Sequence, residues 1–543
     1  MHQHAFLVLP AGILLCWTAF AQISNDCSGK PERLGSVSFP VSCSAATQPR
    51  FDRAVALLHS FQYATAESAF AEIAKKDPSC AMAFWGQAMS LFQPLFELPN
   101  DDTLRKGKEL VAQAVKAGAK TDRERDYIHA TVVLYQDAPK LEQGARLKAF
   151  SSAMAEVYER YPQDWEAGAF YALSLLPWYR DDQPQARAEA LTILKVLFAK
   201  EPRHPGVAHY LIHAADTPEL AHEGLEAAQR YAEIAPSSAH ALHMPSHIFS
   251  RIGLWKDSVD SNLASAAAAA QATRKGDNQS EYQLHAMHHL LYAYLQMGRD
   301  SDARRVVDEV RDVPGIDDVD TASDGSLMNS IFLMETHQWN EAVQVASPVH
   351  ADLSSKMRIH WMRAIAACRL GETDEARKDV ANLLDDFSSL RKQNPLASPD
   401  NALVLEAEAW LAHAQGKDDD AVSKMHAAIR VDEFSVDDES LPAYEMLGDL
   451  QLELHRPDAA LDAYEASLKE APNRFNSLWG AGRAAELSNH HDEAVSYYTN
   501  LAKVSDSRNT RPAFLAAKAF LAKNKKSVVN PQTHEPGPTG CDR

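Results

Sequence analysis

A period of 34 residues in the carboxy-terminal part of the chain constrains the fold more than any other sequence feature. Three pairs of identical residues keep this spacing, namely Gly448 and Gly482, Ala460 and Ala494, and Tyr464 and Tyr498. A repeat of this length accommodates two antiparallel helices, with small residues at the point where they cross. Because one such hairpin cannot bury its apolar face alone, the period predicts an array of stacked hairpins rather than separate globular domains.

Weaker copies of the pattern occur outside this region. A small residue is followed by an apolar residue four positions later and by another three positions after that, starting at Ala303, Ala376 and Ala421. The pattern resembles the tetratricopeptide repeat (TPR), in which a proline ends the second helix; here Pro472 follows Ala460 by 12 residues. We therefore predict an all-α fold, a right-handed TPR-type α-solenoid of roughly a dozen helical hairpins.

The predicted organisation of the chain follows from this array and from the breaks in it. Two internal segments are acidic or contain proline, and the end of the chain is polar and rich in Pro and Gly, as is typical of loops and disordered ends. In order, we expect a signal peptide (1–21), an amino-terminal extension (22–47), TPR-like helical repeats with a histidine-rich groove (48–312), an acidic loop (313–325), helical repeats (326–389), a linker (390–401), carboxy-terminal TPR repeats (402–523) and a disordered tail (524–543).

The first residues, MHQHAFLVLPAGILLCWTAFAQ, are typical of an export signal. An apolar run from Phe6 to Phe20 is followed by the small residue Ala21, which predicts cleavage near Ala21 and a periplasmic or secreted protein. The run is too short to span a bilayer, and we predict no membrane span elsewhere. In an oxidising compartment Cys43 and Cys80 could join the amino-terminal segment to an early helix, but the odd number of remaining cysteines leaves the connectivity open.

Charge and known motifs exclude several classes of function. The net charge is −20, from 54 Lys and Arg against 74 Asp and Glu, and no long run of basic residues is present. Nucleic acid is therefore not expected as a partner. The sequence contains no HExxH helix, GxSxG elbow, Walker-type lysine loop or CxxCH motif, so motifs assign no catalytic residue.

Three histidine-rich segments are the strongest candidates for a functional site. In HPGVAHYLIHAADTPE (204–219) a helix would place His209, His213 and Asp216 within about 60° of one another. In HALHMPSHIF (240–249) a continuous helix would do the same for three histidines, at 240, 243 and 247, but Pro245 would bend it. The helix could instead begin at Pro245, with the second of these histidines in the loop before it.

The third segment, EYQLHAMHHLLYAYLQMGR (281–299), carries His285, His288 and His289. The last two are about 100° apart on a helix and cannot both face one pocket. If residues 218–235 and 256–270 are the second helices of their hairpins, the three histidine segments are the first helices of consecutive units. Side chains from adjacent walls would then converge on one groove.

Histidines at i and i+4 have the spacing of metal ligands in zinc sites and in some copper sites. Several neutral imidazoles can surround one cation, and a carboxylate such as Asp216 would fix the tautomer of a ligand. The candidate metal-binding residues are His209, His213, Asp216, His240, His243, His247 and His285. Each histidine considered alone is more often a hydrogen-bonded interior or groove residue than a metal ligand, and Asp216 is equally consistent with a helix cap in front of Pro218.

The segments 39–89, 204–221 and 235–255 together resemble a family of exported bacterial TPR proteins with HYLIHxxD and HMPSHIF signatures. The resemblance implies the repeat fold and a recurrent histidine-rich groove, and it implies no particular reaction. Two functions therefore remain open. The protein is either a scaffold that binds a peptide or protein partner in its groove and carries a histidine-lined metal site, or a zinc- or copper-dependent enzyme acting in the same groove.

Overall fold

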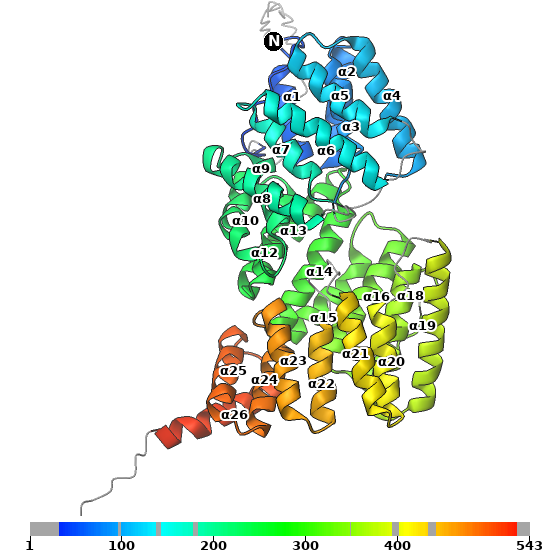
Figure 1. The fold of residues 1–543 in the computed structure, drawn as a ribbon, viewed down its shortest axis with the longest axis vertical. Coiled ribbons are helices and arrows are strands. Elements are labelled where there is room, and N and C mark those ends of the chain that lie inside the picture. The colour runs from blue at the N-terminus through cyan, green and yellow to red at the C-terminus, as the bar shows by residue number, and fades with distance from the viewer. Residues whose placement is uncertain are drawn as a thin grey trace, which may run out of the picture. The chain divides into compact units, whose positions relative to one another are not determined.

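Helices make up all the regular secondary structure in the described part of the chain (Figure 1). The computed structural model describes residues 32–95, 99–136, 143–177, 183–347, 349–393, 401–432 and 441–528. From Leu34 onward these residues belong to one compact unit. The prediction of an all-α fold is confirmed, whereas the predicted signal peptide lies outside the described residues.

Nearly all the helices pack as sequential hairpins. Those of the amino-terminal part are α1 (Gln48–His59), α2 (Tyr63–Lys76), α3 (Ala81–Ser90), α4 (Asp101–Ala117), α5 (Asp122–Tyr135), α6 (Gln143–Arg160), α7 (Trp165–Ser174) and α8 (Gln183–Lys200). The histidine-rich part contains α9 (Pro205–Ala215), α10 (Ala221–Ile234), α11 (Ala239–His243), α12 (Pro245–Arg251), α13 (Trp255–Arg274), α14 (Ser280–Gln296) and α15 (Asp300–Glu309).

The remaining helices continue the array to the carboxy terminus. They are α16 (Asp318–Glu335), α17 (Trp339–Ala342), α18 (Leu353–Leu370), α19 (Thr373–Gln393), α20 (Ala402–Ala414), α21 (Asp418–Asp432), α22 (Ala443–Glu453), α23 (Pro457–Glu470), α24 (Phe475–Leu487), α25 (His491–Val504) and α26 (Pro512–Val528). A short 3-10 turn, Val310–Asp312, follows α15.

The residues that carry the 34-residue period meet where the two helices of a hairpin cross. A Cβ atom added at Gly448 would lie 2.7 Å from the Tyr464 ring, and one added at Gly482 would lie 2.4 Å from the Tyr498 ring. Glycine therefore lets the aromatic ring of the second helix press against the backbone of the first. This contact explains why glycine and tyrosine recur together with the same period.

The predicted acidic loop, 313–325, is wrong from residue 318 onward, where α16 begins. The Asp317 carboxylate accepts hydrogen bonds from the backbone N–H groups of Val319 and Asp320, both at 2.8 Å. Acidic residues stabilise the first turn of a helix, so the charge run starts this helix rather than forming a loop. At the predicted linker (390–401), helix α19 continues to Gln393, and at the predicted tail (524–543), helix α26 continues to Val528. Residues 394–400 and 529–543 lie outside the described ranges.

The apolar core is divided into separate clusters, and the first boundary lies within the histidine-rich part. One cluster of buried side chains runs from Leu34 to Phe249, and the next begins at Trp255. The last repeats also return to this region, because the Trp255 indole N–H donates to the Asn473 carbonyl at 2.8 Å and Arg511 pairs with Asp300 at 2.7 Å. Helix α24 accordingly contacts α14 (both labelled in Figure 1).

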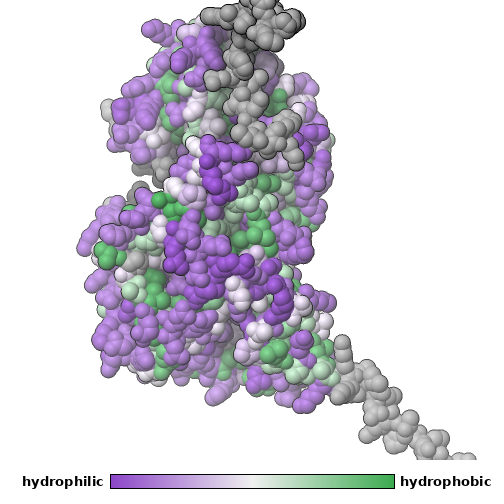
Figure 2. All heavy atoms as spheres, turned by 180° about the vertical axis from the view of Figure 1, so that it is seen from behind, coloured by the Kyte–Doolittle hydropathy of each residue, from purple (hydrophilic) through white to green (hydrophobic). Residues whose placement is uncertain are grey.

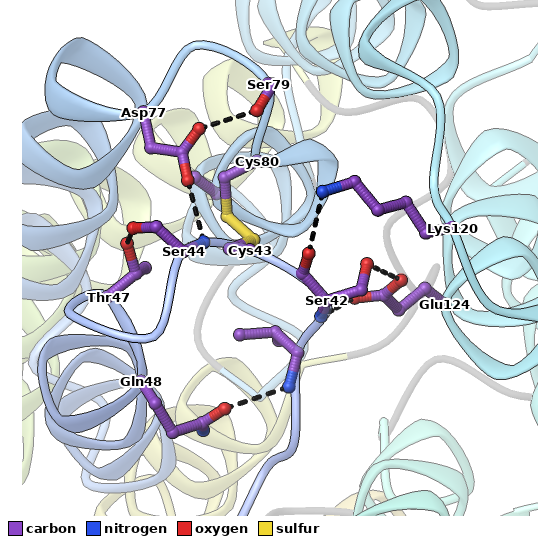
Figure 3. The surroundings of a disulfide bond; sticks show 12 residues. Ser42, Cys43, Ser44, Thr47, Gln48, Asp77, Ser79, Cys80, Lys120 and Glu124 are labelled. Atoms are coloured by element: carbon purple, nitrogen blue, oxygen red, sulfur yellow. Dashed lines mark hydrogen bonds between the residues drawn. A yellow bond between two sulfur atoms is a disulfide. The ribbon is translucent and has the colours of Figure 1, made fainter.

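A disulfide between Cys43 and Cys80 ties the segment before α1 to the start of α3 (Figure 3). On either side of it, the Ser44 N–H donates to Asp77 at 3.0 Å and the Ser42 N–H donates to Glu124 at 2.6 Å. The sequence left this pairing open among several, and the structure selects it. A buttressed disulfide of this kind is typical of proteins in oxidising compartments.

Polar side chains cover most of the face seen in Figure 2, and the apolar patches on it are small and separate. Among the described residues, no helix combines the length and the apolar character that a bilayer crossing needs.

Candidate metal centre

Helix α9 carries the first pair of histidines. It begins at Pro205, and the ring of His204 caps it by accepting a hydrogen bond from the Val207 N–H at 3.2 Å. Proline suits the first helical position because its missing N–H would have no partner there. His209 and His213 then lie one turn apart, the first buried and the second half-buried.

The second segment folds as two short helices rather than one. Ser238 caps α11 through its hydroxyl, which accepts from the Ala241 N–H at 3.3 Å, and α12 begins at Pro245. The alternative that placed a helix start at Pro245 is therefore correct, but His243 ends α11 instead of lying in a loop. His240 and His243 belong to α11, and His247 belongs to α12.

Helix α14 supplies the remaining imidazoles. His285 and His289 are one turn apart, and both lie against His243, with ring centroids at 4.4 and 4.6 Å. His289 was not among the predicted ligands. Its i,i+4 spacing from His285 repeats that of the other two segments and could have identified it, but the sequence did not show whether His288 or His289 faced the groove.

The imidazoles form two adjacent groups, within each of which the possible ligand atoms all lie within 4.8 Å of one another. We call them the three-His site (His209, His213 and His240) and the four-His site (His243, His247, His285 and His289). The sites meet at two ring contacts, His213 to His247 at 6.2 Å and His240 to His243 at 6.0 Å between centroids.

The Nε2 atoms of five of these rings converge inside the two sites. The His209 Nε2 lies 3.1 Å from the Nε2 atoms of both His213 and His240. In the four-His site, the Nε2 atoms of His243 and His247 are 3.0 Å apart. Ligands in a tetrahedral site with metal–nitrogen bonds of about 2.0–2.1 Å would be about 3.3 Å apart, close to these separations.

Hydrogen bonds on the opposite ring nitrogen fix the tautomers. The Nδ1 atom of His209 lies 2.7 Å from the carbonyl oxygen of His59, and that of His243 lies 2.7 Å from the side-chain oxygen of Asn262. Because a carbonyl oxygen can only accept, each Nδ1 carries the proton. The neutral rings of His209 and His243 therefore present bare Nε2 lone pairs to their sites.

Asp216 lies in neither site, although it was among the candidate ligands. Its carboxylate accepts from the His247 Nδ1 at 3.0 Å and from the Arg251 Nε at 2.9 Å. It fixes the tautomer of His247, as the sequence analysis anticipated for this carboxylate. The alternative role as a cap in front of Pro218 is wrong, because α10 begins only at Ala221 and has no side-chain cap.

Burial keeps these imidazoles neutral. It lowers the pKa of His209 to about 3 and that of His285 to about 3, since a charged ring would lose its hydration. Burial and the neighbouring imidazoles also lower the pKa of His213, His240 and His243 well below the usual value. At neutral pH these five rings are thus uncharged nitrogen donors that need not lose a charge to bind a cation.

Aromatic rings enclose the three-His site. The Phe61 ring contacts all three imidazoles, at 4.3 Å from His209, 5.6 Å from His213 and 5.7 Å from His240 between centroids. Tyr231 stacks on His209 at 5.3 Å. Phe61 is fully buried, and its φ of 55° places a bulky residue in the left-handed region. Such backbone strain costs ~1–3 kcal/mol and often accompanies functional sites.

A third cluster of possible ligands, His59, Glu166 and His204, has a different character. The Nδ1 of His204 accepts the N–H of Val207, so its Nε2 carries the proton and donates to Glu166 at 3.0 Å. His59 bonds the other carboxylate oxygen at 2.7 Å. Although burial disfavours its charge, the two imidazoles hold the pKa of Glu166 well below its usual range. This cluster is a satisfied hydrogen-bond network beneath the three-His site.

Comparison with known protein families identifies a repeat in the carboxy-terminal part of the chain. A family model described as tetratricopeptide repeat matches residues 445–509. One similar solved structure is a tetratricopeptide repeat protein from Parabacteroides merdae, with 12% identity and a TM-score of 0.28 over 53% of this chain and 98% of that chain. Another is the human IFIT1 dimer with PPP-AAAA, with 11% identity and a TM-score of 0.36 over 74% of this chain and 87% of that chain.

A search of curated protein sequences found no match. The matched repeat region lies carboxy-terminal to both histidine sites, so no comparison bears on their chemistry. The chain is therefore an all-α protein of sequential helical hairpins that contains a tetratricopeptide-repeat region at residues 445–509.

Proposed function

We propose that this protein binds two transition-metal ions, zinc or copper, one in the three-His site and one in the four-His site. The observation that carries the proposal is the pair His243 and His247. Acceptors lie at the Nδ1 atoms of both rings, so in the neutral rings the Nε2 lone pairs face each other at 3.0 Å. Two lone pairs at this distance repel each other, and a cation that both nitrogens bind removes the repulsion.

The donor chemistry supports a transition metal such as zinc or copper over magnesium or calcium. Imidazole nitrogen suits zinc, copper and nickel, whereas magnesium and calcium prefer oxygen ligands. The supporting hydrogen bonds from a backbone carbonyl, an amide oxygen and a carboxylate are the kind that orient metal-bound histidines. They come from His59, Asn262 and Asp216.

Elemental analysis of untagged protein tests the proposal. We expect about two metal ions per chain, since a genuine site is normally close to full. The double variant His209→Ala/His243→Ala removes one ligand from each site and should lose both ions. The matched control His413→Ala/His491→Ala removes two imidazoles elsewhere and should keep them. Fewer than about 0.1 ions per wild-type chain would reject the proposal.

A scaffold function is the second candidate, and the matched repeat at residues 445–509 supports it. Repeats of this kind present extended surfaces that bind peptides and proteins. We propose that a peptide or protein partner binds this carboxy-terminal repeat surface while the histidine sites bind metal. Replacing ligands of the metal sites should then leave partner capture unchanged, whereas loss of capture together with metal would show that the two functions are one.

We also propose that the protein is exported to the periplasm or secreted. The Cys43–Cys80 disulfide supports this location, because such bonds persist in oxidising compartments. Amino-terminal sequencing of the protein from its native compartment should begin at Gln22. A chain that retains Met1 and is found in a reducing compartment would contradict export.

A further inference from the structure

We propose that the two histidine sites are chemically unequal. The four-His site is saturated by the protein, whereas the three-His site keeps one coordination position for an exogenous ligand, either water or a small anion. This inference rests on the proposed metal binding. Its basis is the general difference between metal sites closed by four protein ligands and sites with three protein ligands and an exchangeable fourth.

The four-His site has a complete tetrahedral donor set. His243 lies within 4.9 Å of each of the other three rings, measured between centroids, and His285 and His289 are 4.8 Å apart. His243 and His289 are buried, and His247 exposes only 14% of its side chain. An ion held by all four nitrogens has no vacant tetrahedral position.

The three-His site lacks a fourth protein donor. In the described chain, no other His, Cys, Asp or Glu offers a ligand atom within 4.8 Å of all three histidines. The neighbouring oxygen atoms already have partners: the Tyr282 hydroxyl donates to the Phe61 carbonyl at 2.6 Å, and Asp216 binds His247 and Arg251. The fourth position must therefore be taken by something other than the protein.

The surroundings limit that ligand to a small molecule. The buried ring of Phe61 covers all three imidazoles, and Tyr231 stacks on His209. His213, at the half-buried edge of the site, marks the side from which a ligand could approach. Three neutral imidazoles leave the full charge of the ion uncompensated, which favours an anion or a water that releases its proton to solvent.

Cobalt(II) absorption with azide as the probe tests the inference on the full-length protein. Cobalt(II) reports coordination number through its visible spectrum, and azide replaces water only where a position is exchangeable. With two cobalt ions bound, we expect a saturable azide-dependent change that corresponds to one of the two ions. His240→Ala should lose one cobalt and the entire azide response.

The matched variant His289→Ala, in the four-His site, should keep the response of the three-His site. If its cobalt is retained, it should gain a second responding ion, because one position has been opened. Circular dichroism of each variant checks folding, and His213→Ala provides a second, less buried substitution that should also abolish the response.

Three results would overturn the inference while leaving metal binding intact. They are two bound cobalt ions of which neither responds to azide, two that both respond in the unaltered protein, and a response that survives in His240→Ala but is lost in His289→Ala. Failure to bind cobalt, zinc or copper at all would instead reject the proposed function itself.

Discussion

Asn262 shows how one buried amide can set the chemistry of a metal ligand. Its nitrogen donates to the Ser258 carbonyl at 2.9 Å, which turns its oxygen toward the Nδ1 of His243. That arrangement keeps the proton on Nδ1 and the Nε2 lone pair directed at the four-His site. Replacing the amide therefore alters the tautomer without removing a ligand.

We expect Asn262→Leu to weaken metal binding at the four-His site by about 10–100-fold, as is usual when the partner of a metal-bound histidine is removed. The three-His site should keep its affinity. Titration against a chelator of known affinity measures both. Ser261→Ala, on the same helix, is the control, because its hydroxyl donates to the Leu242 carbonyl and not to a ligand. Equal losses at both sites would contradict the assignment.

Asp324 makes a pH-dependent contribution away from the histidines. It lines a cavity of about 520 Å³ together with Asp320, Asp352 and Arg358. Burial, with the charges of the two other carboxylates, raises its pKa from 3.8 to about 6. The folded state therefore binds a proton between these pH values that the unfolded state does not, so this residue opposes folding above about pH 6 and ceases to do so below pH 3.8.

Asp324→Asn should accordingly stabilise the protein at pH 8 by ~1 kcal/mol, a figure reduced for the partial exposure of the carboxyl. The stabilisation should vanish near pH 4, where the native carboxyl is itself neutral. Urea unfolding at both pH values measures the difference. A stabilisation of the same size at pH 4 and pH 8 would show that the charge is not its cause.

At this scale the sequence predicted which histidines share a face but not which atom each would present. Periodicity placed His209 and His213 together because helix geometry alone fixes that relation. The choice of His289 over His288 depended on how α14 rotates against its neighbours. Likewise, the two partners of the Asp216 carboxylate, His247 and Arg251 of α12, lie 31 and 35 residues further along the chain.

At the scale of elements, the break between α11 and α12 determines that there are two sites. Helix α11 has five residues and carries His240 and His243 three positions apart, one for each site. Pro245 then starts α12 and directs His247 toward His243. The sequence left a continuous helix and a break at this proline as alternatives, because proline is tolerated in a first turn and also kinks an interior.

Arg474 joins four helices that are distant in sequence. Its buried guanidinium, at the start of α24, donates to Glu445 of α22, to Glu335 of α16 and to Tyr292 of α14. Burial and the charge of Glu445 raise the pKa of Glu335. Burial acts in the same direction on Glu445, but the contact with Arg474 brings the pKa of that carboxyl below its usual value.

One carboxylate is therefore enough to neutralise Arg474. We expect Glu335→Gln and Glu445→Gln each to cost less than about 1.5 kcal/mol, because the remaining carboxylate keeps the arginine paired. The double variant should cost ~3–5 kcal/mol, more than the sum of the two single losses, since it leaves a buried charge unpaired. Denaturant unfolding of the three variants measures the coupling, and additive losses would contradict a shared ion pair.

At the scale of the whole molecule, the sequence predicted the array of hairpins but not the contacts between the last repeats and the middle of the chain. The period reports how neighbouring hairpins pack, and this part of the prediction is confirmed. It contains no information on contacts such as those from Trp255 to Asn473 and from Asp300 to Arg511, which join residues 218 and 211 positions apart. Those contacts depend on how small rotations accumulate from repeat to repeat, which no local pattern specifies.

The disulfide also links parts of the chain that are distant in sequence. It links positions 37 residues apart, for which chain entropy predicts a stabilisation of ~3–4 kcal/mol. Reduction should therefore lower the thermal unfolding midpoint of the native protein. Cys43→Ala/Cys80→Ala should unfold at that lower midpoint with or without reductant. A native midpoint unaffected by reductant would show that the bond contributes nothing measurable.

The central claim is that the seven converging histidines bind two metal ions. Anomalous X-ray diffraction from crystals grown with stoichiometric zinc, recorded on both sides of the zinc absorption edge, tests it most directly. We expect two peaks, each about 2.0–2.1 Å from the imidazole nitrogens of one site. A map without peaks at these histidines, or with zinc bound only elsewhere on the chain, would contradict it.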